Sequence, residues 1–329
     1  MKQVVYISNA KSKQIHVWRI NEQGKLTFLQ NLTVPGEVQP MKISQDGNHL
    51  YVGIRPNSAI ITYLIAVDGT LIQEKITDLP GIPTHIEIDK YNRLLFIPSY
   101  HQGNLSVLPI NQYGIPEPAI QVINDLKNPH GSIVSFDNLH LFVSCLGEDY
   151  IRIYTISNDG YLNEKIANRL FTKNGSGPRH LIFSPNQATL YCLNELNATI
   201  ILYSAFEPYK KLKIYNILPN ELKCNPWASD IHITKNGKYL YASERSTSII
   251  RHFKIINNGF ELLPMDYYIT EYQPRSFTID QTNNFLIVAG QKSNHVIVYK
   301  IHKITGVLQA LDRYKVGNEP SWITTHLIQ

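Results

Sequence analysis

The sequence predicts an all-β fold, namely a seven-bladed β-propeller with four antiparallel strands in each blade. One recurring pattern leads to this prediction: a proline, a short apolar strand, a polar turn built on Asp or Asn, and a second apolar strand. The pattern runs through the whole chain of 329 residues, and no stretch shows the 3.6-residue spacing of an amphipathic helix. Repeated short strands of this kind are typical of propeller blades.

The repeat has a regular period, and this period defines the domain organisation. Successive repeats are separated by 43 to 49 residues. This spacing fits a blade of four short strands. The units begin at the prolines at positions 40, 83, 129, 178, 226, 274 and 320, so we expect residues 1–329 to form a single domain.

The unit that spans residues 226–273 shows the predicted plan of one blade. The sequence KNGK at 235–238 predicts a hairpin turn between two apolar strands, and NNG at 257–259 predicts the turn between the two outer strands. The four strands of this blade are expected at residues 230–234, 239–242, 248–255 and about 261–263.

The two ends of the chain are predicted to share one blade. Six complete units begin at the prolines from 40 to 274, and the 39 residues before them and the 10 residues after them together have the length of one more unit. We therefore expect residues 321–326 to form the innermost strand of a blade whose outer strands come from residues 4–34. This pairing would close the ring.

Composition and charge exclude several classes of function. Hydrophobic residues make up 43% of the chain and charged residues 17%, with no run of 18 apolar residues that would cross a membrane. The N-terminus lacks the apolar segment of a secretory signal, so the cytoplasm is the expected compartment. The net charge of +5 is spread without a lysine or arginine run, which argues against nucleic-acid binding and is compatible with a pocket for an anion. The sequence does not predict the oligomeric state.

The cysteines point to neither disulfides nor a metal site. The chain has three of them, Cys145, Cys192 and Cys224, which is an odd number, and no two show the C-x-x-C spacing of a zinc ligand pair. We expect all three to be buried, reduced thiols.

The repeat also locates a candidate site. In a propeller the innermost strand of each blade lines the central channel, and functional residues gather at the mouth of that channel. Antiparallel pairing places the residue after the repeat's proline beside the residue about 16 positions later. On this rim we expect ten residues, most of them ionisable: Arg55, His85, Tyr100, His130, Arg179, Glu195, Glu244, Arg245, Arg275 and Lys292.

The same register predicts individual neighbours on the rim. A turn near residues 185–187 brings Arg179 opposite Glu195, close enough for an ion pair. In two other blades it places His130 near residues 145 and 146, and Arg275 near residues 290 and 291.

Three other kinds of site find little support. The sequence GQKS at 290–293 lacks the first glycine of a phosphate-binding loop and leads into a strand rather than a helix. Asp230 and His232 would supply two metal ligands, but no third ligand is indicated, so no metal is predicted. No G-x-S-x-G elbow is present, which leaves a serine-nucleophile hydrolase unsupported. No cofactor is predicted.

Along its whole length the chain resembles the bacterial 6-phosphogluconolactonases of the seven-bladed β-propeller lactonase (cycloisomerase 2) family. Members of this family also resemble fungal enzymes that interconvert muconate and its lactone. The most specific stretches are QIHVW at 14–18, QPM at 39–41, GPRH at 177–180, YCLNELN at 191–197, WASDIHIT at 227–234, QPR at 273–275 and AGQKS at 289–293.

The resemblance implies hydrolysis of 6-phospho-D-glucono-1,5-lactone to 6-phosphogluconate in the oxidative pentose phosphate pathway, with a phosphorylated sugar lactone as the partner. It also implies an active-site histidine at His130, arginines at Arg179 and Arg275, and an acidic residue at Glu195. The segment PHGS at 129–132 departs most from the family, which usually has a different residue before the histidine. We expect the other six rim residues to bind substrate.

These residues suit the chemistry of lactone hydrolysis. The reaction needs a base that activates water and donors or cations that face the oxygen of the tetrahedral intermediate. Arginine also binds phosphate through paired hydrogen bonds. We expect either His130 or Glu195 to activate water, and Arg179 and Arg275 to stabilise the oxyanion and hold the substrate. Glu195 is expected to stay ionised beside Arg179.

Two rival functions stay open at this stage. A non-catalytic interaction propeller would share the fold, because fold alone does not determine function. No Trp-Asp dipeptide of such scaffolds occurs in the chain. A cycloisomerase acting on a muconate-type lactone would use the same arginines to bind carboxylates.

Overall fold

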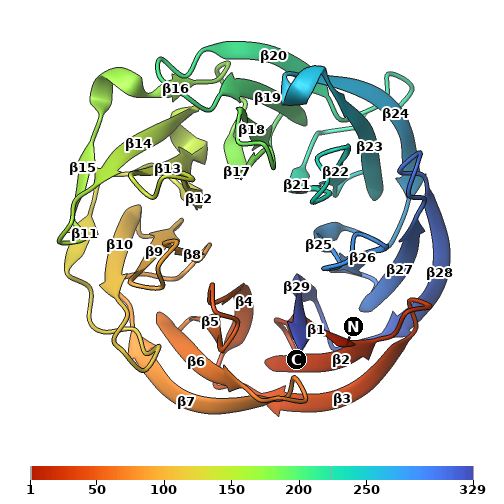
Figure 1. Ribbon diagram of the computed structural model, residues 1–329, viewed down its shortest axis with the longest axis horizontal. Coiled ribbons are helices and arrows are strands. Elements are labelled where there is room, and N and C mark those ends of the chain that lie inside the picture. The colour runs from red at the N-terminus through yellow and green to blue at the C-terminus, as the bar shows by residue number, and fades with distance from the viewer. Residues whose placement is uncertain (1, 223, 329) are drawn as a thin grey trace.

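The structure is a computed structural model that describes residues 2–222 and 224–328. In this part of the chain seven β-sheets follow one another around a central axis and close into a ring (Figure 1). Each sheet has four strands, and the fourth blade carries one extra short strand. The strands follow sequence order from the axis outward, except that the innermost strand of the first blade comes from the C-terminal end of the chain. The predicted seven-bladed propeller is confirmed.

The first three blades contain both ends of the chain. Blade 1 consists, from the axis outward, of β29 (Pro320–Ile328), β1 (Lys2–Asn9), β2 (Gln14–Ile20) and β3 (Leu26–Thr33). Blade 2 consists of β4 (Glu37–Ile43), β5 (His49–Arg55), β6 (Ala59–Ile65) and β7 (Leu71–Asp78). Blade 3 consists of β8 (Glu87–Ile88), β9 (Leu94–Ser99), β10 (Asn104–Pro109) and β11 (Gln121–Ile123).

The next two blades differ in their outer edges. Blade 4 consists of β12 (Pro129–Val134), β13 (His140–Cys145), β14 (Tyr150–Ile156) and β15 (Leu162–Glu164), and the short β16 (Leu170–Phe171) also pairs with β14. Blade 5 consists of β17 (Pro178–Phe183), β18 (Thr189–Asn194), β19 (Thr199–Ser204) and β20 (Lys211–Asn216).

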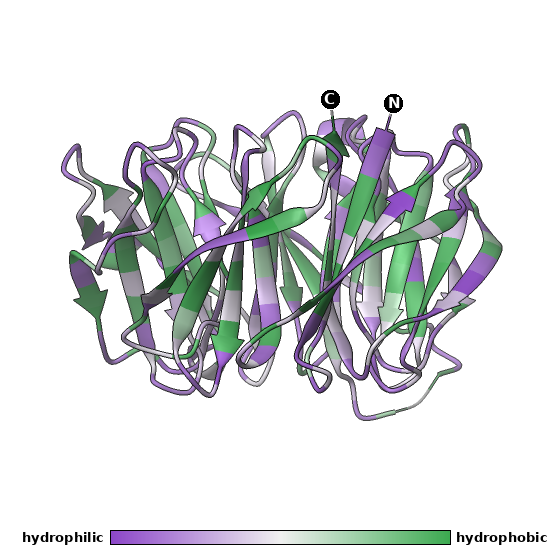
Figure 2. Ribbon diagram, turned by 90° about the horizontal axis from the view of Figure 1, so that it is seen from below, coloured by the Kyte–Doolittle hydropathy of each residue, from purple (hydrophilic) through white to green (hydrophobic). Residues whose placement is uncertain are grey.

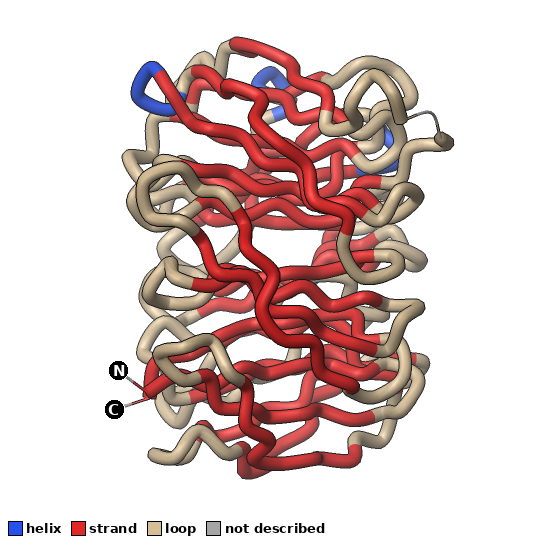
Figure 3. Tube along the Cα trace, turned by 90° about the vertical axis from the view of Figure 1, so that its right-hand side faces the viewer, coloured by secondary structure: helices blue, strands red, loops and turns tan. Residues whose placement is uncertain are grey.

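The last two blades are regular. Blade 6 consists of β21 (Ala228–Ile233), β22 (Tyr239–Glu244), β23 (Ile249–Ile256) and β24 (Glu261–Ile269). Blade 7 consists of β25 (Pro274–Ile279), β26 (Phe285–Gly290), β27 (His295–Ile301) and β28 (Leu308–Lys315). Short 3₁₀ turns occur at η1 (Leu146–Glu148), η2 (Ile166–Asn168) and η3 (Asn257–Gly259). Loops occupy the two faces of the ring (Figure 3).

Hydrophobic contacts between neighbouring blades hold the ring together. Residues in the body of the strands are mostly hydrophobic, whereas the loops at the two faces are hydrophilic (Figure 2). The buried apolar residues form one cluster at each junction of neighbouring blades. At the junction of blades 1 and 2, for example, Tyr6 and Val17 pack with Val38 and Leu50. Each blade packs against a neighbour on both of its faces. Both sides of each sheet are therefore buried, and its strands contain hydrophobic residues at consecutive positions.

The chain ends close the ring as the repeat predicts. Strand β29 pairs antiparallel with β1, from Asn9 opposite Pro320 to Lys2 opposite Ile328. A cluster that includes Ile7 and Ile323 joins this blade to blade 7. No helix within the described part of the chain has the length and apolar character needed to span a membrane.

The start of the innermost strand is irregular in several blades. In blades 4, 5 and 7 the pairing shifts by one residue directly after the first proline, so that His130, Arg179 and Arg275 have no partner in the hydrogen-bond ladder. Such β-bulges bend the strand and change the direction of a side chain. The proline is compatible with this position because it starts the strand, where its missing N–H is not needed.

One polar residue lies inside the hydrophobic junction of blades 6 and 7. The side chain of His252 is fully buried, stacks on Tyr241 with ring centroids 5.0 Å apart, and has no hydrogen-bond partner for either ring nitrogen among the described residues. Burial lowers the pKa of His252 to about 4. The imidazole is therefore neutral in the folded protein near pH 7.

Acidification is expected to destabilise the protein through this residue. As the pH falls from 7.5 to 5, the unfolded chain binds a proton on His252 with a pKa near 6.5 while the folded chain does not, so unfolding becomes easier. We expect a loss of about 2 kcal/mol from His252 over this range. Urea unfolding at several pH values measures it, and His252→Phe, which keeps the stacking, should flatten the pH dependence by that amount. An unchanged slope in His252→Phe would contradict the prediction.

Candidate functional site

A cavity of about 230 Å³ opens at the face of the ring where the innermost strands begin. Seven of the ten residues predicted for the rim line it: Arg55, Tyr100, His130, Arg179, Glu195, Arg245 and Arg275. Four polar or aromatic residues that were not selected from the sequence line it too: Gln39, Thr84, His101 and Trp227. Side chains from six neighbouring blades, blades 2 to 7, thus meet in one cavity.

Two repeating positions supply most of the lining. The first is the bulge at the start of the innermost strand, which turns His130, Arg179 and Arg275 into the cavity. The second lies at the opposite end of the same hairpin, where Glu195 directly follows β18 and Arg245 directly follows β22. Because the strands are antiparallel, both positions lie at the same face of the ring.

Three of the predicted rim residues lie elsewhere. His85 stands one residue beyond the bulge position and lines a second cavity, further along the channel. The carboxylate of Glu244 turns back to accept hydrogen bonds from the backbone N–H groups of Trp227 and Thr247, at 2.6 and 2.7 Å. Lys292 is half exposed and forms an ion pair with Glu319 at 2.7 Å.

A network of charged groups forms one wall of the cavity. The guanidinium of Arg179 donates from Nε to Glu195 Oε2 at 2.7 Å, which is the ion pair that the register predicts. Nη2 of Arg245 lies 3.1 Å from the same oxygen, and the Trp227 indole N–H donates to Glu195 Oε1 at 3.0 Å. Arg245 also lies over the Trp227 ring, with its central carbon 3.7 Å from the ring centroid. Cation–π contact and hydrogen bonds together hold these side chains in place.

The protonation state of Glu195 follows from these contacts. Burial alone would raise the pKa of this carboxyl, but the charges of Arg179 and Arg245 and the hydrogen bond from Trp227 outweigh burial and lower the pKa. Glu195 is therefore an ionised acceptor with both oxygens engaged.

His130 stands in a different environment. Its ring lies 5.2 Å from that of His180 and 6.1 Å from that of Tyr100, and its Nδ1 is buried without a hydrogen-bond partner in the described chain. Burial and the charge of Arg179 lower the pKa of His130 well below its usual value. The imidazole is thus neutral near pH 7 and lines the cavity as an unprotonated base.

Of the four arginines that line the cavity, Arg275 has the most free donors among the described residues. Within residues 2–222 and 224–328, its guanidinium makes no hydrogen bond and no ion pair, although it lines the cavity. Burial and the nearby charges of Arg179 and Arg55 lower its pKa to about 10, so it still carries its charge near pH 7. Four arginines and one carboxylate line this cavity, so it has a surplus of positive charge, which is favourable for an anion.

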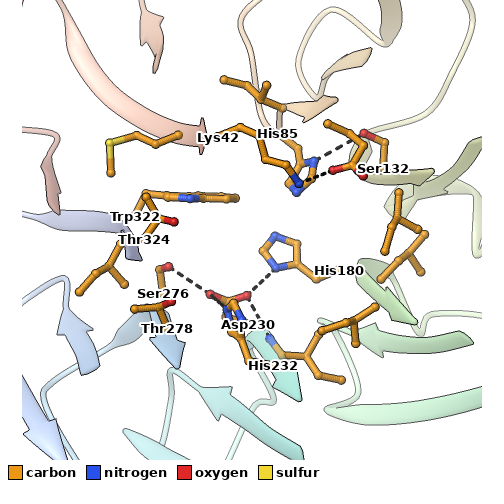
Figure 4. A pocket seen from close by; sticks show the side chains of 18 residues that line it. Lys42, His85, Ser132, His180, Asp230, His232, Ser276, Thr278, Trp322 and Thr324 are labelled. Atoms are coloured by element: carbon orange, nitrogen blue, oxygen red, sulfur yellow. Dashed lines mark hydrogen bonds and ion pairs between the residues drawn. The ribbon is translucent and has the colours of Figure 1, made fainter. Parts of the chain in front are cut away.

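The second cavity has a volume of about 310 Å³, and three ring side chains, those of His85, His180 and Trp322, are among its lining (Figure 4). These three rings contact one another, with centroid distances of 5.7 to 5.9 Å. In this second cavity the charged groups have partners: Lys42 forms an ion pair with Glu87 at 2.6 Å, and the carboxylate of Asp230 lies in hydrogen-bond contact with the ring of His180 at 2.9 Å. Its internal pairing leaves less free charge for a ligand than the arginine-lined cavity has.

Asp230 and His232, the two possible metal ligands named from the sequence, both line the second cavity. His232 Nε2 lies 3.4 Å from Asp230 Oδ2, so these two residues contact each other. In the described ranges no group of three or more His, Cys, Asp or Glu side chains is arranged to hold a metal ion.

Sequence comparison finds close relatives. A family model described as lactonase, 7-bladed β-propeller, matches residues 4–325. A protein of Xenorhabdus nematophila named 6-phosphogluconolactonase is 47% identical over 324 residues, which is 98% of this chain and 99% of that protein. A protein of the same name from Photorhabdus laumondii is 48% identical over 324 residues, with the same coverage of both chains.

Solved structures share the fold. The periplasmic gluconolactonase of Pseudomonas aeruginosa superposes with a TM-score of 0.92 over the whole of both chains, at 20% sequence identity. A protein from Lactobacillus plantarum superposes with a TM-score of 0.91 at 22% identity, covering 99% of this chain and 100% of that chain. At this level of identity the likeness supports the architecture and nothing finer.

Proposed function

The chain belongs to the lactonase family of seven-bladed β-propellers, and from this premise we propose that it hydrolyses 6-phospho-D-glucono-1,5-lactone to 6-phosphogluconate, a step of the oxidative pentose phosphate pathway. Curated relatives named 6-phosphogluconolactonase, 42 to 48% identical over nearly the full length, support this choice. They do not favour the interaction propeller or the muconate-type cycloisomerase.

The observation that carries the proposal is the surplus of arginine in the cavity. A sugar phosphate brings nearly two negative charges, and a lactone gains a third on its carbonyl oxygen in the transition state. Arg275 has free donors for such an anion, and no described residue bonds Nη2 of Arg179. Arginine holds phosphate through two parallel hydrogen bonds, so we assign Arg275 to the phosphate and Arg179 to the lactone oxygen.

The proposed reaction needs one base and one oxyanion site. A water molecule attacks the lactone carbonyl carbon while His130 takes its proton, and the guanidinium of Arg179 stabilises the oxygen that becomes negative. The bond from the carbonyl carbon to the ring oxygen then breaks, and the protonated His130 returns its proton to that oxygen. The products are a free hydroxyl and a carboxylic acid, which releases its proton to the solvent and becomes a carboxylate, with no change in oxidation state.

His130 suits the role of base better than Glu195. Both oxygens of Glu195 already accept hydrogen bonds or pair with arginines, and its lowered pKa makes the carboxylate a poor proton acceptor. His130 is neutral and lines the cavity. We therefore propose that Glu195 holds Arg179 and Arg245 in place while His130 handles the proton.

We also propose that the protein acts in the cytoplasm. Its substrate class, phosphorylated sugars, is made there. The three cysteines are free thiols in the structure, which suits a reducing compartment.

The purified protein is expected to open freshly prepared 6-phosphogluconolactone well above the spontaneous rate. Gluconolactone, which lacks only the phosphate, should react with a kcat/KM at least tenfold lower, because Arg275 loses its partner. Acid release measured in a weakly buffered solution follows both reactions, and a muconolactone tested in parallel checks the cycloisomerase. No turnover of any of the three lactones would overturn the proposed function.

A further inference from the structure

The nitrogen Nη1 of Arg179 contacts two groups that do not belong to the arginine-lined cavity, one of which, His180, lines the second cavity. This nitrogen donates to the backbone carbonyl of Ser229 and lies 3.0 Å from Nε2 of His180. A guanidinium nitrogen has no lone pair to offer, so Nε2 of His180 must be the acceptor in this contact. The neutral His180 therefore carries its proton on Nδ1.

That proton has a fixed partner. His180 Nδ1 lies 2.9 Å from Asp230 Oδ1, and Figure 4 shows the two side chains pointing toward each other in the second cavity. Burial and the charge of Arg179 lower the pKa of His180 to about 4, so the imidazole is neutral near pH 7. Asp230 thus selects the tautomer that presents a lone pair to Arg179.

Asp230 is itself held by donors from the next blade. Its Oδ2 accepts hydrogen bonds from Ser276 Oγ at 3.1 Å and from the backbone N–H of Phe277 at 3.2 Å, and His232 Nε2 lies 3.4 Å away. These donors suit an ionised carboxylate and would clash with an amide N–H₂ group turned toward the backbone. The carboxylate is therefore matched to its site in charge and orientation.

Other groups around His180 do not supply this contact. His85 and His130 face its ring at 5.8 and 5.2 Å, and Trp322 faces it at 5.9 Å, all as ring contacts without a hydrogen bond. With Nε bound to Glu195 and Nη1 bound to Ser229 and His180, Nη2 remains as the nitrogen of Arg179 available to the cavity.

We propose that Asp230 and His180 are positioning residues that act through Arg179: they fix its guanidinium so that Nη2 stays directed at the reacting lactone oxygen. This inference rests on the proposed function for its kinetic consequences. In metal sites and catalytic triads, too, a carboxylate that does not touch the substrate fixes the tautomer and orientation of a histidine.

The kinetic test compares variants that keep or remove the acceptor for Arg179. Asp230→Asn is expected to lower kcat at least tenfold with little change in KM, because the amide admits the wrong tautomer of His180. His180→Leu removes the acceptor and should lose at least as much, whereas His180→Gln places a carbonyl oxygen near the position of Nε2 and should recover part of the rate. Thr324 also lines the second cavity but does not contact Arg179, His180 or Asp230 by a hydrogen bond, so Thr324→Val should leave the rate unchanged.

A double-mutant cycle separates positioning from a general structural role. If Asp230 acts through Arg179, Asp230→Asn should cost at most twofold in an Arg179→Ala background, against at least tenfold in the wild-type background. An equal cost in both backgrounds, or a wild-type rate in Asp230→Asn, would overturn the proposal. Thermal unfolding of every variant identifies losses caused by misfolding.

A measurement without substrate keeps this proposal separate from the proposed function. Nitrogen-15 spectra of the substrate-free protein should show His180 protonated on Nδ1, and Asp230→Asn should shift the side-chain N–H signals of Arg179. If the wild-type protein turns over no lactone but these signals behave as expected, the proposed function fails and the positioning stands. If His180 carries its proton on Nε2, the positioning fails whatever the activity.

Discussion

Replacing Arg179 by alanine is expected to lower kcat on 6-phosphogluconolactone at least tenfold, with a smaller effect on KM. In the proposed reaction the guanidinium of Arg179 stabilises charge that develops only in the transition state, and loss of such an interaction lowers kcat. Arg275→Ala should instead raise KM at least tenfold for the phosphorylated lactone, because a phosphate contact is present in the ground state and in the transition state alike. Steady-state kinetics corrected for spontaneous opening measures both effects.

Two controls make this comparison specific. Arg313→Ala removes an arginine of the outer strand β28 that pairs with Glu271 at 2.6 Å, far from the cavity, and should leave both constants unchanged. On gluconolactone, which has no phosphate, Arg275→Ala should approach wild-type behaviour while Arg179→Ala should not. Wild-type rates in both variants on the phosphorylated substrate would contradict the assignment of these arginines.

Neither variant is expected to unfold the protein. Without Arg179, Glu195 keeps Arg245 and the Trp227 indole as partners, so no buried charge is left alone. The side chain of Arg275 has no hydrogen bond to lose within the described chain, and its backbone carbonyl, which accepts from Ser229 Oγ, is kept in the alanine variant. A melting temperature within a few degrees of wild type would separate loss of function from loss of fold.

The repeat made most of the site predictable, because hydrogen-bond register follows from the turn. Arg179 and Glu195 were expected to face each other from the position of the turn alone, and they form the predicted ion pair. The proline was a good marker in blades 4, 5 and 7, where it starts the innermost strand and the bulge residue follows it.

The proline was a poorer marker in blades where it is not the last paired residue before the bulge. In blade 2 the paired residue equivalent to Pro178 is Val38, so Gln39 takes the bulge position although it precedes Pro40. His85 follows its proline by two positions rather than one, and this single step moves its side chain into the second cavity. A shift of one residue along a strand changes where a side chain lies, because successive side chains of a strand point in opposite directions.

Charge alone does not identify the residues that line the cavity. Thr84 and Trp227 follow repeat prolines and line the cavity, although neither side chain is ionisable near neutral pH. Glu244 was included for its charge and instead holds the backbone of Trp227. A signal for Trp227 existed in the sequence, since an indole beside predicted charges offers a hydrogen-bond donor and a surface for cation–π contact.

Deleting residues 320–329 is expected to abolish cooperative folding at 25 °C. Strand β29 is the innermost strand of blade 1, and without it the fully buried residues Val4 to Ile7 of β1 form an exposed sheet edge. Exposed apolar edges promote aggregation. Far-UV circular dichroism during heating and size-exclusion chromatography measure the outcome, and deleting only residues 328–329 serves as the control that keeps nearly all of the pairing.

This effect should be larger than the loss of one strand from an open sheet, because β29 also joins the two neighbouring blades. Gln281 of blade 7 donates to the backbone carbonyl of Thr325 at 2.8 Å, and Ser321 donates to the carbonyl of Val38 in blade 2 at 3.1 Å. On this basis we propose that the ring unfolds as one domain. Trp322 also connects β29 to the candidate site, since it packs against His180, which contacts Arg179.

A synthetic peptide of residues 318–329 added to the truncated chain should restore both folding and activity. A truncated chain that stayed folded and active without the peptide would show that closure by β29 is dispensable.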